Sequence, residues 1–344
     1  MSQVRLPARV ILLTQIALLF LSGCGSMAPS TTTGKAPTPT TSPRRGGPCY
    51  KPATSKEVVV PVEFTTQAPN ETIVQACVGR QGPFRFIVDT GATGTLISTR
   101  VAGRLGLAPL GPPASFGSEG CQGSTQPVRL PTLRVGKRVI APSTAYTISV
   151  KGFGGPGEPV GTLGVPALSS LGPIKLDYLR RQLSIGPRDW KVSHGLHSPS
   201  DGIPSRWLSQ KAQIVAPLTI LHRNGHASLR VEVRFHGGAA HEWIPDTGSQ
   251  TSIVDGTSVS ASHLRYAPSS EDVPSLCSSK PLTVRRAWSG HWELSGHPLR
   301  PELLQVSSVS RTVGADGVLG GSTFVSFGSV IFDWPDHLLF LGAR

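Results

Sequence analysis

Residues 86–98 read FIVDTGATGTLIS, and this stretch decides the fold. Three apolar residues lead directly into the tripeptide Asp89-Thr90-Gly91, and a second apolar pair follows within the same stretch. The pattern predicts a buried strand, a tight loop that carries a carboxylate, and a second strand. Because a carboxylate is costly in an apolar loop, Asp89 is a candidate functional residue.

Residues 243–254 read WIPDTGSQTSIV and repeat this arrangement around Asp246. One Asp-Thr-Gly sequence is weak evidence, since aspartate before glycine is common in turns, but two in matching apolar frames are stronger. If the loops face each other, Asp89 and Asp246 share one site. Two carboxylates at about 3 Å cannot both ionise, so the pair holds one proton and provides both an acid and a base for activating water.

An internal repeat extends the match over both halves of the chain. Asp246 follows Asp89 by 157 residues (246 − 89), and four further segments match at a spacing of 156, as 317 does to 161. These pairs are VVVPV (58–62) with IVAPL (214–218), GTLG (161–164) with GVLG (317–320), LGPIKLDY (171–178) with FGSVIFDW (327–334), and LSIG (183–186) with LFLG (339–342). The repeat predicts two lobes of one design, residues 57–190 and 211–344, joined by residues 191–210.

The composition favours β-structure in both lobes. Charged residues make up 15% of the 344 residues, and the chain has 39 glycines and 31 prolines. Apolar β-branched runs alternate with Gly and Pro turns at the spacing of a small barrel or folded sheet. We therefore expect an all-β protein. None of the 10 histidines shows a metal-binding spacing such as H-E-x-x-H, so we expect no metal site.

The combined motifs resemble the aspartic proteases of the pepsin and retropepsin type. The two Asp-Thr-Gly sequences, the apolar-apolar-Gly segments at 162–164 and 318–320, and the C-terminal segment 324–342 carry the resemblance, which covers nearly all of residues 57–344. It implies a bilobal acid-protease fold of two pseudo-twofold-related, retropepsin-like β lobes. Retropepsins carry one Asp-Thr-Gly per chain and dimerise, whereas this chain carries both and is expected to act as a monomer.

The same resemblance implies the chemistry of the site. Asp89 and Asp246 would be the catalytic pair that activates water to hydrolyse a polypeptide substrate, without metal or cofactor. The hydroxyls of Thr90 and Thr247 would each bond into the opposite loop and lock the two loops together. The supporting set also includes Gly91, Gly248 and Ser249.

The residue after each Asp-Thr-Gly differs between the lobes. Ser249 carries a hydroxyl that could donate to the Asp246 carboxylate and favour its charged form, whereas Ala92 offers none to Asp89. We therefore expect Asp246 to be the more acidic member of the pair and Asp89 to hold the proton. With one donor missing, we expect a working pH nearer neutral than in pepsins.

Pro245 departs from the family pattern, which has an apolar residue with a free N–H before the aspartate. Proline removes one donor from the strand ladder. The sequence therefore predicts a shifted loop or partial degeneration in lobe 2. This departure supports an alternative function, in which the chain is a catalytically inactive, protease-fold binding lipoprotein of the cell envelope.

A glycine-rich segment, residues 116–124, is a candidate flap over the substrate because its glycines, Gly117, Gly120 and Gly123, allow it to hinge. Its counterpart in lobe 2 lies near residues 275–281. The alternative interpretation is a plain surface hairpin.

Four cysteines outside the leader form an even set in a chain that we expect to be exported. They are Cys49, Cys77, Cys121 and Cys277. Four cysteines allow three pairings, and one hypothesis joins Cys121 to Cys277, because they are equivalent in the repeat, and Cys49 to Cys77. Free thiols are the alternative.

The N-terminal 23 residues predict an export signal. Two arginines precede an apolar run that is short for a membrane span and ends in Leu21-Ser22-Gly23-Cys24. This ending resembles the lipobox of bacterial lipoproteins, which implies lipidation of Cys24 and a membrane anchor on the extracytoplasmic side. An ordinary signal peptide is the alternative. Residues 24–56 are rich in Ser, Thr and Pro and predict a tether.

The net charge of +13 and the pI of about 10.1 raise nucleic acid as a partner. Because the chain is predicted to be exported, its basic residues are scattered, and no nucleic-acid-binding motif is present, we expect no nucleic-acid partner. Anionic lipid headgroups or wall polymers would explain the charge, as would a basic surface without a partner. The sequence thus predicts an aspartic endopeptidase of exported or cell-envelope proteins, with a binding lipoprotein or a wall-associated structural module as alternatives.

Overall fold

The computed structural model describes residues 48–50, 53–54, 56–64, 69–118, 121–150, 152–187, 207, 212–223, 225–273, 282–308 and 314–342. The predicted signal, most of the predicted tether and most of the connection 191–210 lie outside these residues. Cys24, Gly120 and Cys277 also lie outside them. The boundaries predicted for the five segments therefore remain predictions.

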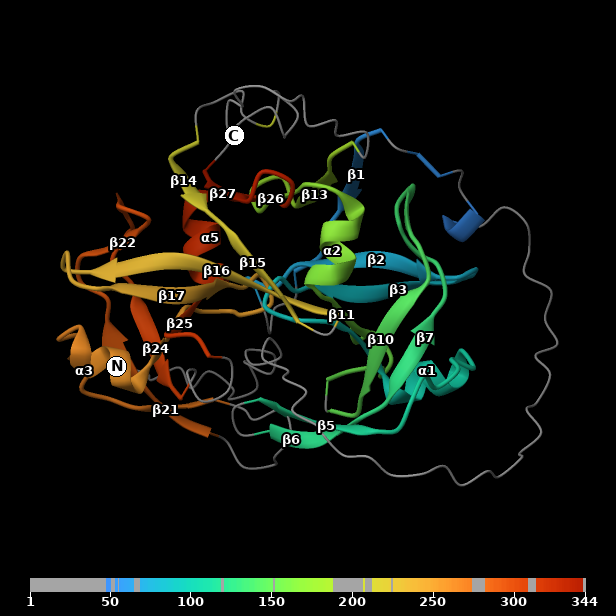
Figure 1. Cartoon of the computed structure of the whole chain (residues 1–344), viewed down its shortest axis with the longest axis horizontal. Coiled ribbons are helices and arrows are strands. Elements are labelled where there is room, and N and C mark those ends of the chain that lie inside the picture. The colour runs from blue at the N-terminus through green and yellow to red at the C-terminus, as the bar shows by residue number, and fades with distance from the viewer. Residues whose placement is uncertain are drawn as a thin grey trace, which may run out of the picture.

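Lobe 1 is built on a curled sheet of eight strands in the order β7-β10-β4-β11-β3-β2-β8-β9. Its strands are β2 (Ile73–Val78), β3 (Gln81–Val88), β4 (Thr95–Ser98), β7 (Pro127–Leu130), β8 (Leu133–Val135), β9 (Arg138–Ile140), β10 (Ser143–Ile148) and β11 (Gly161–Leu163). A separate hairpin joins β5 (Ala114–Ser118) to β6 (Cys121–Thr125). Figure 1 shows this lobe in cyan and green, with the hairpin at its lower edge.

Lobe 2 repeats this order with β21-β24-β18-β25-β17-β16-β22-β23 at the centre of a larger sheet. These strands are β16 (His226–Phe235), β17 (Ala240–Pro245), β18 (Ile253–Asp255), β21 (Leu282–Trp288), β22 (Trp292–Leu294), β23 (His297–Pro298), β24 (Leu303–Ser307) and β25 (Gly317–Leu319). The additional strands are β15 (Thr219–Arg223), β19 (Arg265–Tyr266) and β20 (Glu271–Val273). The matching strand order confirms that the repeat encodes two copies of one β-lobe.

The apolar-apolar-Gly segments thread through each lobe as expected. Strand β11 lies between β3 and β4, parallel to the first and antiparallel to the second, and β25 lies in the same way between β17 and β18. Gly161 and Gly317 begin these strands. A Cβ at Gly161 would collide with the Leu96 carbonyl, and one at Gly317 would lie 2.6 Å from the Trp243 ring, so only glycine allows the close approach.

A six-stranded sheet joins the lobes, in the order β1-β13-β12-β26-β27-β14. Its strands are β1 (Val58–Pro61), β12 (Ile174–Asp177), β13 (Gln182–Ile185), β14 (Ile214–Pro217), β26 (Ser329–Asp333) and β27 (Leu338–Leu341). The lobes meet where β12 pairs antiparallel with β26, so that Ile174 lies opposite Phe332. Figure 1 shows this sheet along the upper edge of the molecule. One apolar core extends through both lobes beneath it.

Short helices connect the strands: η1 (Pro48–Tyr50), α1 (Thr99–Arg104), α2 (Val165–Leu171), α3 (Gly256–Ala261) and α5 (Gly321–Phe327). Helices α2 and α5 follow the threading strands at equivalent places in the two lobes. Among the helices of the described ranges, none has the length and apolar character that crossing a membrane requires.

A disulfide joins Cys49 to Cys77, with a Cα–Cα distance of 5.6 Å, and ties η1 to β2. This half of the predicted pairing is confirmed. Cys121 begins β6, whereas its predicted partner Cys277 lies outside the described residues, so the second bridge remains a prediction.

Candidate active site

The fold brings Asp89 and Asp246 together at the interface between the lobes. Each follows a strand of its own lobe, β3 or β17, and both side chains are fully buried. The carboxyl group of Asp246 packs on Gly91, since a Cβ there would lie 2.7 Å from Asp246 Oδ1, and Asp89 packs on Gly248 in the same way, at 2.6 Å from Cγ. The two aspartates predicted from sequence therefore share one site.

Backbone amides hold one oxygen of each carboxyl group. Asp89 Oδ1 accepts hydrogen bonds from the N–H groups of Gly91 (3.1 Å) and Ala92 (2.9 Å), and Asp246 Oδ1 accepts one from Gly248 (2.7 Å). Oδ2 of each aspartate is buried without a hydrogen-bond partner among the described residues. Because buried polar oxygens are normally paired, these two atoms are the ones available to a water molecule or a substrate.

The threonines lock the two loops together, as the resemblance implied. The Thr90 hydroxyl donates to the Pro245 carbonyl (2.7 Å) and accepts from the Thr247 N–H (3.0 Å). In return, the Thr247 hydroxyl donates to the Val88 carbonyl (2.7 Å) and accepts from the Thr90 N–H (3.2 Å). Both side chains are fully buried. Each hydroxyl thus satisfies two backbone groups of the other lobe.

Replacing Thr247 by valine is expected to destabilise the protein by about 2–4 kcal/mol, because two buried backbone groups lose their partners while the shape of the side chain is kept. Chemical denaturation measures the free energy of unfolding. The control is Thr219→Val, at an exposed position of β15, where we expect a change within about 0.5 kcal/mol. If the two variants had the same free energy of unfolding, the Thr247 hydroxyl would not stabilise the contact between the two loops.

Both aspartates have a raised pKa, and their hydrogen bonds do not favour the predicted order of acidity. Burial raises the pKa of Asp89 to about 6, although the N–H groups of Ala92 and Gly91 partly offset it. Burial and the charge of Asp89 raise the pKa of Asp246 well above its usual range. The two groups titrate as a pair, and the two backbone N–H groups on Asp89 Oδ1, against one on Asp246 Oδ1, favour Asp89 as its ionised member, which differs from the expectation from the sequence. Burial acts on both groups alike, and the Ser249 hydroxyl, on which the expectation rested, is bonded elsewhere.

Ser249 was predicted to donate a hydrogen bond to the Asp246 carboxylate, and this prediction is wrong. Its hydroxyl donates to the Thr251 carbonyl (2.8 Å) rather than to Asp246. The hydroxyl instead stabilises the turn that follows Asp246, where Ser249 also accepts a hydrogen bond from the Gly321 N–H at its own carbonyl. The prediction failed because a serine hydroxyl can reach a nearby backbone carbonyl as easily as a carboxylate.

Pro245 leaves the lobe 2 loop in place. It ends β17 opposite Leu319, and the next N–H, that of Asp246, donates to the Leu319 carbonyl at 2.9 Å. The equivalent bond in lobe 1 joins the Asp89 N–H to the Leu163 carbonyl at 3.1 Å. The proline costs one ladder donor without displacing the aspartate, so the expected shift of the loop is wrong.

The candidate flap is a β-hairpin. Gly117 lies in β5 and Gly123 in β6, where Phe116 pairs with Gly123, and Gly120 belongs to the connecting turn outside the described residues. Figure 1 shows β5 and β6 between the lobes at the lower edge of the molecule. In lobe 2, β20 pairs with β21, and residues 274–281 between them are not described. The flap role remains a prediction.

Three residues of the site were missed by sequence reasoning: Asn70, Glu71 and Gln250. The Asn70 side-chain amide donates to the Gln250 carbonyl (2.9 Å), and the Asn70 N–H donates to Gln250 Oε1 (3.3 Å). Glu71 is fully buried beside them. The available signal was a charged residue two positions before the apolar strand β2. A carboxylate is costly to bury there, so its presence indicates a functional role.

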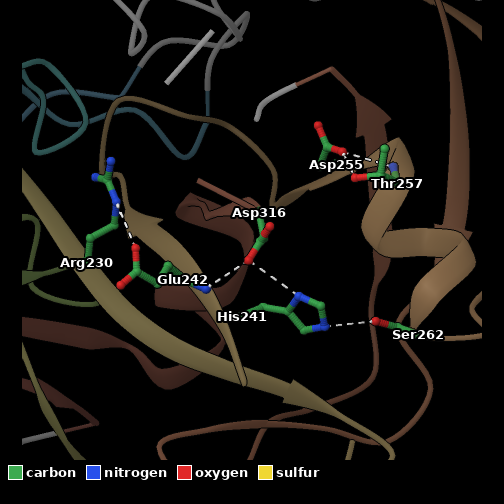
Figure 2. Close-up of polar contacts among 7 residues, drawn as sticks. All are labelled: Arg230, His241, Glu242, Asp255, Thr257, Ser262 and Asp316. Atoms are coloured by element: carbon green, nitrogen blue, oxygen red, sulfur yellow. Dashed lines mark hydrogen bonds and ion pairs between the residues drawn. The ribbon is translucent and has the colours of Figure 1, made fainter. Parts of the chain in front are cut away.

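Lobe 2 contains a second polar cluster with the residue types of a serine hydrolase. The His241 ring lies between Asp316 (Nδ1–Oδ2 3.4 Å) and the Ser262 hydroxyl (Nε2–Oγ 3.2 Å), as Figure 2 shows. Ser262 ends α3, where the negative end of the helix disfavours a developing alkoxide. The N–H groups of residues 262–264 all donate to carbonyls of α3, which leaves no local oxyanion donor among them.

This cluster has an apolar counterpart in lobe 1. The residues 157 or 156 positions earlier are Phe84, Leu105 and Val160. All three belong to the apolar core or pack against it. The polar cluster therefore occupies a packing position of the repeat and joins α3, β17 and β25, so its arrangement supports a structural role.

Comparison with known proteins finds one family match, within lobe 1. Residues 74–167, from β2 to the start of α2, match the family model for aspartyl proteases. No curated protein matches the chain. The fold as a whole, with two threaded β-lobes joined by a shared sheet and one aspartate loop from each, is the bilobal acid-protease fold.

Solved structures with a similar fold include two seed globulins and a bacterial protease. Basic 7S globulin from soybean is 12% identical, with 84% of this chain and 95% of that chain covered and a TM-score of 0.42. Conglutin gamma, a basic 7S globulin from lupine seeds, is 11% identical over 86% and 96%, with a TM-score of 0.40. A retropepsin-like aspartic protease from Rickettsia conorii is 17% identical over 38% and 89%, with a TM-score of 0.26.

Proposed function

We propose that the chain is an aspartic endopeptidase that hydrolyses peptide bonds with one water molecule held between Asp89 and Asp246. The observation that carries the proposal is the pair of buried carboxyl groups, one from each lobe, each with one oxygen fixed by backbone N–H groups and the other without a partner. The aspartyl protease match over residues 74–167 supports it.

The proposed mechanism assigns different parts to the two aspartates. Ionised Asp89, the more acidic member, accepts a proton from the water as it attacks the peptide carbonyl carbon. Protonated Asp246 donates to the carbonyl oxygen, where negative charge develops. As the C–N bond of the resulting gem-diol breaks, the leaving amine takes up the proton that Asp89 received, and one diol hydroxyl returns a proton to Asp246, which restores the starting state. The threonine lock supports this chemistry because it fixes the two carboxyl groups relative to each other.

Peptide hydrolysis is expected to rise as the pH rises through about 6, because the base Asp89 has a pKa of about 6 and acts only when ionised. The measurement is kcat/KM of the purified chain on an unfolded polypeptide between pH 3 and 9. A statine-type inhibitor, whose hydroxyl would replace the water, should stop the reaction. A profile that peaks at strongly acidic pH would contradict the assignment of Asp89 as base.

The remaining parts of the proposal concern the oligomeric state, the membrane anchor and the substrates of the enzyme. A single chain supplies both aspartates, which supports action as a monomer on a polypeptide substrate. Lipidation at Cys24 would anchor it to the membrane on the extracytoplasmic side, so exported or envelope proteins are the proposed substrates. Metabolic labelling with a fatty acid tests the anchor, and Cys24→Ala should abolish the label. An inactive binding protein would keep the fold and bind polypeptide without cleaving it.

A further inference from the structure

Glu71 occupies a fixed place between the two catalytic loops. It lies just before β2, and its side chain is fully buried. On one side, Asn70 is held by Gln250 of the lobe 2 loop. On the other side, the Thr72 carbonyl accepts a hydrogen bond of 2.8 Å from the Val88 N–H, next to Asp89. The residues on both sides of Glu71 are therefore hydrogen-bonded to the loops that carry the two aspartates.

The surroundings of Glu71 are polar, and the charges that act on it from the described part of the chain are negative. Both its carboxyl oxygens are buried without a hydrogen-bond partner among the described residues. Thr72 Oγ1, Tyr178 Oη and Gln250 Nε2 are further buried polar atoms of this environment. Besides burial, the charges of Asp89 and Asp246 raise the pKa of Glu71, and the side-chain amide of Gln250 lowers it. Tyr178 belongs to the same environment, since Thr72 and Asp246 both act on its hydroxyl.

Burial followed by the charge of Asp89 raises the pKa of Glu71 well above its usual range. Full burial beside two other carboxyl groups favours the neutral form of Glu71, so that the three acids together carry one negative charge in the state that we propose to be active. Ionisation of Glu71 would add a second charge to a buried site in which hydrolysis also develops negative charge on the carbonyl oxygen. Like charges at this depth are poorly screened, so the transition state would be destabilised.

We propose that Glu71 is a third carboxyl group of this site, a positioning residue that must keep its proton while Asp89 and Asp246 act, and whose ionisation ends activity at alkaline pH. The inference rests on the proposed endopeptidase function. It assigns the first step of the alkaline limit to Glu71, ahead of the ionisation of Asp246, which the mechanism also needs in its protonated form, and it leaves the acid limit to Asp89.

The test is the pH dependence of kcat/KM for Glu71→Gln, which fixes the neutral form in nearly the same shape. We expect kcat/KM within about threefold of the wild type at its optimum, an unchanged acid limb, and an alkaline limb displaced upward by about one pH unit or more. Glu63→Gln is the matched control. Glu63 lies outside the buried site, is partly exposed and pairs with Arg85 at 3.0 Å, so the same loss of charge should leave both limbs in place.

An alkaline limb of Glu71→Gln that superimposes on the wild-type limb would overturn the proposal, as would a folded Glu71→Gln that is inactive at every pH. If Glu71→Gln does not fold, Glu71→Met carries the same expectation, because it is also neutral and similar in length.

Thermal unfolding provides a readout that needs no hydrolysis. Because the pKa of Glu71 is raised in the folded state, its contribution to stability is present at low pH and is lost as the pH rises through that folded pKa. The wild type should therefore lose Tm toward alkaline pH, and Glu71→Gln should lose less. If the wild type shows no hydrolysis, the endopeptidase proposal fails, and the Tm comparison alone decides whether Glu71 holds a buried proton. If Tm then falls with pH equally in the wild type and in Glu71→Gln, Glu71 does not hold a buried proton either.

Discussion

Replacement of either catalytic aspartate by asparagine is expected to lower kcat/KM for peptide hydrolysis by at least about 10³-fold. Asparagine fits the space of each carboxyl group but can neither accept a proton, as Asp89 must, nor donate an acidic one, as Asp246 must. The two variants should fail equally, because the two groups act as a unit. The measurement is cleavage of an unfolded polypeptide by each purified variant at the wild-type optimum.

The same variants should be more stable than the wild type. Both aspartates have raised pKa values in the folded state, so their favourable contribution is present at low pH and is lost as the pH rises through those values. Asp89→Asn should therefore raise Tm clearly at pH 8 and little at pH 4. The control is Asp272→Asn, an exposed position on β20, which should change neither activity nor Tm appreciably. Full activity in either dyad variant would refute the endopeptidase proposal.

Much of the fold could be predicted because its signals are local and occur twice. The pattern of a buried strand, Asp-Thr-Gly and a second strand is visible in any short window around Asp89 or Asp246. The glycines that begin β11 and β25 are visible as well, and a constant spacing between matching segments relates the two lobes. The pairing of β12 with β26 was not predicted, because two equivalent strands must meet across an interface whose geometry the repeat alone does not specify.

The site was predicted less completely because its electrostatics depend on long-range contacts. The burial of Glu71 depends on the bond between Asn70 and Gln250, which are separated by 180 residues. The raised pKa values of both aspartates depend on full burial and on the carboxyl group that the other lobe places beside each, and neither is a property of the neighbouring sequence. The hydroxyl of Ser249 had two acceptors within reach, and residue type does not choose between them.

The loop glycines should be as intolerant of change as the aspartates themselves. A Cβ at Gly91 would fall 2.7 Å from Asp246 Oδ1 and closer still to the carboxyl carbon, and a Cβ at Gly248 would fall 2.6 Å from Asp89 Cγ. Neither carboxyl group can retreat, because Oδ1 of each is held by backbone N–H groups and the threonines fix the loops. Gly91→Ala and Gly248→Ala must therefore separate the two aspartates.

We expect Gly91→Ala to lower kcat/KM by about 10²-fold or more, since a displacement of about 1 Å is enough for such a loss, and to destabilise the protein by about 1–3 kcal/mol through overpacking. Gly103→Ala is the matched control, because a Cβ at this position of α1 meets nothing within 4 Å and should stabilise the helix by about 0.5–1 kcal/mol. Steady-state kinetics and urea unfolding of the three alanine variants separate the effects. If Gly91→Ala hydrolysed peptides at the rate of Gly103→Ala, the two carboxyl groups would not need their close approach, and the shared-water mechanism would be wrong.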